Sequence, residues 1–155
     1  MKIQSIVVPV VLSFLWAGCG TINHTQYQLT GPRRADGLRA AVSAEDRERV
    51  TEIVTALAAR FKLKDFSQSS RVPHLLVYFH EPDAQNPMKL SARVVGDHIL
   101  IDLMRTFAEV GETLTYRSAK ETLWSELKDA FGDRVTIVDF RKTTLAPVSE
   151  ASGSQ

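Results

Sequence analysis

Residues 80 and 81 are a His-Glu pair, which is how the zinc-binding motif H-E-x-x-H begins. That motif needs a second His four residues on, so that both imidazoles lie on one face of a helix. Here Ala84 occupies the position of the second His, and Pro82 disfavours the helix. The chain also has no glycine-rich phosphate loop and no G-x-S-x-G motif. We therefore expect no catalytic residues, no metal and no cofactor.

Four polar residues fall on one face of the sheet that the sequence predicts: His80, Arg93, His98 and Asp102. They form the candidate binding face. His80 and His98 could approach each other across strands, with Asp102 or Glu81 as a further metal ligand, but nothing in the sequence requires a metal there. Arg93 and Asp102 lie diagonally opposite, which suits either a cross-strand ion pair or a surface that binds a polar ligand.

Several aromatic side chains could supply the apolar wall of a ligand pocket. Trp124 lies beside the main apolar stripe of its helix, so we expect it at the rim of the core, with an exposed anchor for a partner as the alternative. The set is Tyr78, Phe79, Tyr116, Trp124 and Phe140.

The strongest local pattern covers residues 88–104. Gly96 and Asp97 fit a two-residue hairpin turn with glycine first, as type II′ requires. This turn pairs Val95 with His98 and Leu90 with Leu103. Six apolar side chains then share one face, whereas a slip of one residue would scatter them. They are Leu90, Ala92, Val94, Ile99, Ile101 and Leu103.

Two amphipathic helices and two further strands complete the predicted elements. Ser43 caps a helix over residues 44–62, and Ser118 begins a capping box that starts a second helix, which ends at Gly132. Residues 72–81 and 135–140 read as strands. Residues 27–29 could add a short strand, and residues 113–116 an edge strand.

This element order predicts an α+β fold. We expect a two-layer sandwich in which both helices pack on one face of a mostly antiparallel sheet of about four strands, similar to a ferredoxin-like arrangement. The globular domain spans residues 43–142. Residues 19–42 are predicted to be a tether and residues 143–155 a disordered tail.

The N-terminus has the features of a secretory signal. Lys2 precedes an almost entirely apolar run at residues 6–16, which is too short for a comfortable membrane span. Ala17, Gly18 and Cys19 follow, and Cys19 is the only cysteine. This segment resembles the lipobox of bacterial lipoproteins, although Leu15 stands one position early and Trp16 takes its place. An ordinary signal peptide or an uncleaved anchor are the alternatives.

The resemblance implies cleavage of residues 1–18 between Gly18 and Cys19, and a lipid on Cys19 that anchors the chain to a membrane. In that family Gly20 favours an outer-membrane location facing the periplasm.

The charge of the mature chain excludes some partners. Removing residues 1–18, which hold one Lys and no acidic residue, leaves 18 basic and 18 acidic residues. This balance argues against a nucleic-acid partner. The sequence therefore predicts a small, non-enzymatic envelope lipoprotein that binds an envelope protein. The alternative is a small-ligand-binding or hydrolytic domain that uses the candidate binding face.

Overall fold

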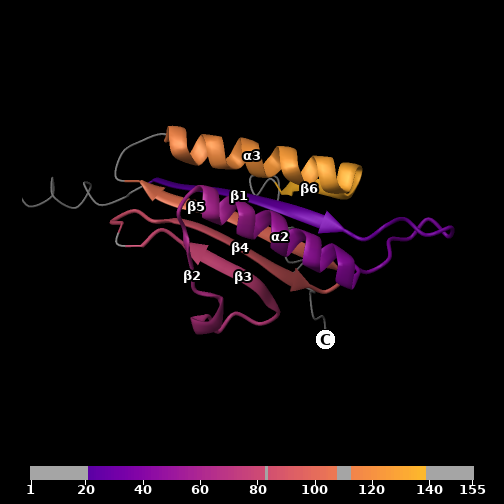
Figure 1. Cartoon of the computed structure of the whole chain (residues 1–155). Coiled ribbons are helices and arrows are strands. Elements are labelled where there is room, and N and C mark those ends of the chain that lie inside the picture. The colour runs from indigo at the N-terminus through magenta and orange to yellow at the C-terminus, as the bar shows by residue number, and fades with distance from the viewer. Residues whose placement is uncertain (1–20, 83, 108–112, 139–155) are drawn as a thin grey trace, which may run out of the picture.

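The computed structural model describes residues 21–82, 84–107 and 113–138. These residues form an α+β fold in which two helices accompany an antiparallel sheet of six strands (Figure 1). The sheet order is β2-β3-β4-β5-β1-β6. The elements are β1 (Thr21–Thr30), α2 (Ala44–Arg60), β2 (Lys64–Asp65), β3 (Leu75–His80), β4 (Met88–Val95), β5 (His98–Phe107), α3 (Leu114–Phe131) and β6 (Val135–Val138). Two short 3₁₀ turns, Ser67–Ser69 and Gly132–Arg134, join them.

The hairpin of β4 and β5 has the predicted register. Val95 pairs with His98 and Leu90 with Leu103. Gly96 has φ = 58°, and Asp97 is not among the residues with positive φ. A positive φ at the first central position alone is the signature of a type II′ turn.

The predicted tether over residues 19–42 is wrong for residues 21–30, which form the ten-residue strand β1. β1 pairs with β5 on one side and with β6 on the other. Tyr27 and Leu29 are fully buried, whereas the alternate positions carry polar side chains. Because so few of its residues are apolar, the period of two is weak in the sequence. The remaining predictions for residues 1–20 and 139–155 lie outside the described residues.

Both helices begin at a side-chain cap. Ser43 is the N-cap of α2, as predicted, and it forms a reciprocal capping box with Asp46. The predicted edge strand at residues 113–116 and the predicted start of a helix at Ser118 are wrong, because α3 begins at Leu114 with Thr113 as its cap. Gly132 ends α3 with φ = 57°, as predicted.

The count of about four strands is also wrong, because β1 and β2 are additional members of the sheet. β2 has only two residues, both exposed, so it leaves no periodic signal in the sequence. β3, β4 and β5 are consecutive neighbours and form a meander.

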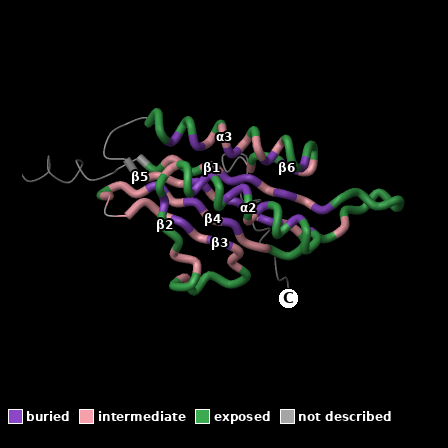
Figure 2. Tube along the Cα trace, viewed as in Figure 1, coloured by how far each residue is buried: buried purple, intermediate pink, exposed green. Residues whose placement is uncertain are grey.

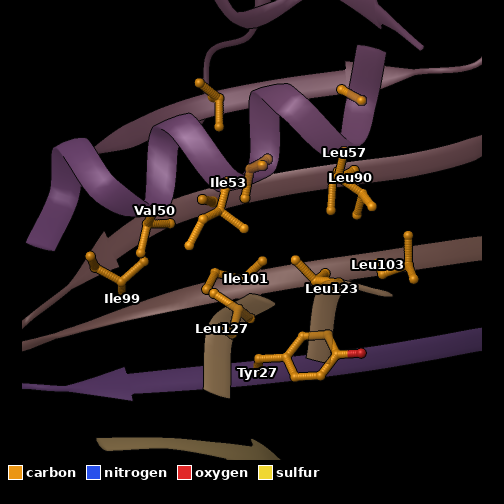
Figure 3. Close-up of a cluster of buried hydrophobic side chains, with 14 of the residues drawn as sticks. Tyr27, Val50, Ile53, Leu57, Leu90, Ile99, Ile101, Leu103, Leu123 and Leu127 are labelled. Carbon is orange, nitrogen blue, oxygen red and sulfur yellow. The ribbon is translucent and has the colours of Figure 1, made fainter. Parts of the chain in front are cut away.

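The core lies between the helices and one face of the sheet, as the close-up in Figure 3 shows. Ile53 and Leu57 of α2, Leu123 and Leu127 of α3, and Ile101 of β5 meet there. Trp124 packs at the edge of this cluster, as predicted. Purple buried segments follow the central strands in Figure 2. No helix among the described residues covers the opposite face of the sheet, which we call the open face.

Candidate functional site

The open face contains a hollow of about 470 Å³ that is open to solvent. Side chains from four neighbouring strands form its floor, and residues from the segment before β3 form one wall. Its lining residues are His24, Ser70, Val72, Leu75, Tyr78, Lys89, Ser91, Arg93, Asp102 and Met104. We call this site the open-face hollow.

The hollow exists because a small side chain stands among long ones. Ser91 lies between Lys89 and Arg93 on β4, and neighbours on one face of a strand are about 6.6 Å apart. Across the sheet, Ser91 pairs with Tyr78 on one side and Asp102 on the other. The side chains of all four neighbours are longer than that of serine, so the surface of the sheet is recessed at Ser91.

Asp102 is held by two side chains of β1. His24 Nε2 lies 2.7 Å from Asp102 Oδ1, and Gln26 Nε2 donates to the same oxygen at 2.7 Å. Gln26 is buried and lies directly opposite Asp102 in the register. The carboxylate is therefore fixed from the side of β1, and the cross-strand ion pair between Arg93 and Asp102 is not formed.

Two cations line the hollow without an anionic partner. Neither Lys89 nor Arg93 forms an ion pair with any described residue. Arg93 Nε is also buried with no hydrogen-bond partner within the described part of the chain. A buried donor without an acceptor costs about 1–3 kcal/mol, so an acceptor supplied by a ligand would be stabilising. The hollow thus contains two positive side chains for one carboxylate that is already hydrogen-bonded.

The two predicted histidines lie away from the hollow. His80 stacks on Phe66 with 3.7 Å between ring centroids, and its Nδ1 lies 3.0 Å from the Glu81 carbonyl oxygen. His98 lies at the hairpin turn, where its Nδ1 is 3.0 Å from Asp97 Oδ1 and lowers the pKa of that carboxyl.

A metal shared by His80 and His98 is excluded by the register. His80 pairs with Lys89 near one end of β4, whereas His98 pairs with Val95 at the other end. Six residues of strand, about 20 Å, separate these positions. Within the described ranges, no group of three or more His, Cys, Asp or Glu side chains could hold a metal ion.

The hollow contains the residue types of a serine hydrolase, but their spatial order does not form a catalytic triad. Ser91, Asp102 and His24 lie on β4, β5 and β1, in that spatial order. A catalytic triad needs the histidine between the serine and the aspartate. Here the aspartate is in the middle, and two strand spacings, about 9.6 Å, separate the serine strand from the histidine strand.

A larger hollow of about 930 Å³ lies elsewhere, between residues 32–43, the start of α2 and the end of α3. Both of its arginines are already paired with carboxylates, and Glu45 and Glu48 also line it. Arg134 contacts Asp46 at 2.6 Å, and Arg49 contacts Glu52 at 2.9 Å. Because these pairs are satisfied internally, we regard the smaller open-face hollow as the better candidate site.

Sequence reasoning found only part of this site. Of the four predicted residues, Arg93 and Asp102 line the hollow, whereas His80 and His98 do not. His24, Lys89 and Ser91 were missed. The alternation of β4 could have identified Lys89 and Ser91, because both share a face with Arg93.

No protein-family model matches this chain, and neither curated proteins nor solved structures gave a match. None of the helices in the described residues is long and apolar enough to cross a membrane.

Proposed function

We propose that this chain is a non-enzymatic binding module, held at a bacterial membrane by a lipid on Cys19, whose open face binds an envelope protein. The observation that carries the binding role is the open-face hollow, where Lys89 and Arg93 have no anionic partner among the described residues. Burial of polar groups without partners is rare in proteins and calls for an explanation. A bound partner that supplies an acceptor is such an explanation.

The arrangement of polar residues favours binding over catalysis. Asp102 separates Ser91 from His24, so no imidazole lies next to the hydroxyl. Nucleophilic catalysis by serine requires that contact. What remains is a recessed surface with cations, hydroxyls and apolar side chains, which suits recognition.

The proposed anchor would hold the domain close to the bilayer. In the sequence, only residue 20 separates Cys19 from Thr21, the first residue of β1. Two residues of chain span at most about 7 Å. The lipid on Cys19 would therefore keep the Thr21 end of the sheet at the membrane surface, with Gly20 favouring the outer membrane and its periplasmic side.

Exposed apolar side chains at that same end support this orientation. Ile22 is 61% exposed and Leu114 is 81% exposed. The hydroxyl of Tyr116 bonds to Thr25 of β1, and Figure 1 shows the first turn of α3 toward the Thr21 end of that strand. Apolar side chains at the headgroup boundary add to membrane affinity.

The experiment that tests the binding role places a photo-reactive p-benzoylphenylalanine on each of two surfaces of the full chain in living cells. Gln28 lies on the open face, and Ser125 lies on the exposed surface of α3. We expect a discrete cross-linked protein from position 28 that position 125 does not give. Adducts from position 125 alone, or from neither position, would contradict the proposal.

A second candidate is a module that binds a small ligand. The volume of the open-face hollow, about 470 Å³, falls within the range of small-molecule pockets, about 300–1,000 Å³. In this case the cells would yield no adduct at position 28, and purified protein would retain a small molecule detectable by mass spectrometry.

A further inference from the structure

We propose that the open-face hollow binds an acidic side chain of the partner, an Asp or Glu that is flanked by an apolar residue. This inference rests on the binding role proposed above and specifies the chemistry of the partner. It follows from the charge of the hollow, from its apolar wall and from its position on an uncovered sheet face.

Charge complementarity selects an anion. Arg93 and Lys89 lie on the same face of β4, on either side of Ser91, and about 13 Å separates their Cα atoms. Asp102 is the only carboxylate among the residues that line the hollow, and His24 and Gln26 already hydrogen-bond its Oδ1. An incoming carboxylate would thus meet two cations that no carboxylate in the described part of the chain neutralises.

The Arg93 guanidinium sets the geometry of this contact. Its Nε is buried without an acceptor among the described residues. A carboxylate has two oxygens, so it can accept from two nitrogens of the same guanidinium at once. A neutral amide has a single acceptor oxygen and no charge, so its contact with the same guanidinium is weaker.

The apolar wall selects what accompanies the carboxylate. Val72, Leu75, Tyr78 and Met104 line the hollow beside the two cations. Val72 is 42% exposed, so it leaves apolar surface for a ligand to cover. A ligand with an apolar group next to its carboxylate would bury this surface as it pairs with Arg93.

The surroundings of the hollow favour a peptide segment over an isolated small acid. The hollow is open to solvent and continues into the face formed by β4, β5 and β1. An extended chain could cross this face and place one side chain in the recess. Interface hot spots commonly take this form, with a single anchor in a pocket.

The test uses the full-length protein extracted from membranes and kept in detergent micelles, with ¹⁵N NMR titrations. One probe is acetyl-leucyl-glutamyl-phenylalanine amide, and its matched neutral control carries glutaminyl in place of glutamyl. We expect the acidic peptide to shift the amide resonances of Tyr78, Ser91 and Arg93, and to bind at least about tenfold more tightly than its control.

Three variants identify the cations. Arg93→Gln and Lys89→Gln should each weaken binding of the acidic peptide by about tenfold. Arg47→Gln, which removes an exposed cation on α2, should leave binding unchanged. Even if one variant fails to fold, the comparison of the two peptides on the unmodified protein decides the proposal.

Equal binding of the two peptides, or no shift at these residues with either, would overturn the acidic-side-chain proposal while leaving the photo-cross-linking result intact. Binding of 3-phenylpropanoate without binding of the peptide would mean that the hollow binds a small acid and not a side chain of a protein, which overturns the proposal. If deletion of residues 143–155 shifts the same resonances, the chain's own tail is the occupant, which also overturns the proposal.

Discussion

Asp46 joins three parts of the fold, and its removal should be unusually costly. The Asp46 carboxylate accepts a hydrogen bond from the Ser43 N–H at 2.9 Å and one from Arg134 at 2.6 Å. Arg134 also donates to the Thr30 carbonyl oxygen at 3.0 Å. These contacts link the start of α2, the turn after α3 and the end of β1. Asp46 is only 8% exposed.

We expect Asp46→Ala to lower the free energy of unfolding by about 2–4 kcal/mol. Hydrogen bonds to charged groups contribute about 1.5–3 kcal/mol each, and the contribution of Arg134 is reduced because its side chain is 28% exposed. Urea unfolding followed by circular dichroism measures the change. Asp133→Ala, at a fully exposed carboxylate nearby, is the control and should stay within about 0.5 kcal/mol.

The stability lost in Asp46→Ala should depend on pH, in a direction that follows from the pKa of Asp46. Burial alone would raise the pKa of Asp46, but hydrogen bonds from Arg134 and Ser43 outweigh it and lower the pKa below 3.8. A lowered pKa in the folded state means that the charged carboxylate stabilises the fold above pH 3.8, and that this contribution is lost as the pH falls through the lowered pKa.

The difference in the free energy of unfolding between wild type and Asp46→Ala should therefore be largest at pH 7 and smaller at pH 3. A double-mutant cycle with Arg134→Ala should give a coupling energy of about 1–2 kcal/mol. A loss below about 1 kcal/mol, or the same loss at both pH values, would refute the reasoning.

Three further outcomes follow from the packing. Tyr116→Phe should cost about 1–2 kcal/mol in urea unfolding, because the buried hydroxyl bonds to Thr25 and to the Leu103 carbonyl oxygen; a neutral result would mean that water replaces it. Gly31→Ala should destabilise the protein more than Gly96→Ala in thermal unfolding, because a Cβ at residue 31 would lie 2.0 Å from the Ala40 carbonyl oxygen. A Cβ at residue 96 meets nothing within 4 Å, so that change costs only the strain of a positive φ. Ile101→Ala should cost about 2–5 kcal/mol, because this fully buried side chain lies at the centre of the core; a loss below about 1 kcal/mol would show that the core closes around the deletion.

The sequence predicted the elements in which two independent signals agree. In the β4–β5 hairpin, the glycine turn and the alternation of apolar residues each specify the same register. α2 combines a serine cap with an apolar stripe. The end of α3 at Gly132 was correct for the same reason, because a glycine follows the last apolar position.

The elements that were missed have weak or competing signals. β1 has polar residues at most positions, and pairing with strands from distant parts of the chain stabilises it. Such pairing leaves no mark in a local window. The start of α3 was misplaced because Ser118 and Glu121 have the spacing of a capping box inside a helix that Thr113 already caps.

The error in β1 also explains the gaps in the candidate site. With residues 19–42 assigned to a tether, His24 and Gln26 had no position in the sheet. Asp102 was therefore given Arg93 as its ion-pair partner, whereas both residues of β1 contact it. Arg93 forms no ion pair within residues 21–82, 84–107 and 113–138, and that feature carries the proposed binding role.

The measurement that tests the membrane assignment most directly is the intact mass of the protein extracted from the membrane fraction, alongside a Cys19→Ala variant. The account predicts a chain that begins at Cys19 and carries acyl groups, with the variant absent from the membrane fraction. An unmodified N-terminus, or a chain that retains residues 1–18, would contradict a lipid anchor and remove the reason to seek the partner at a membrane surface.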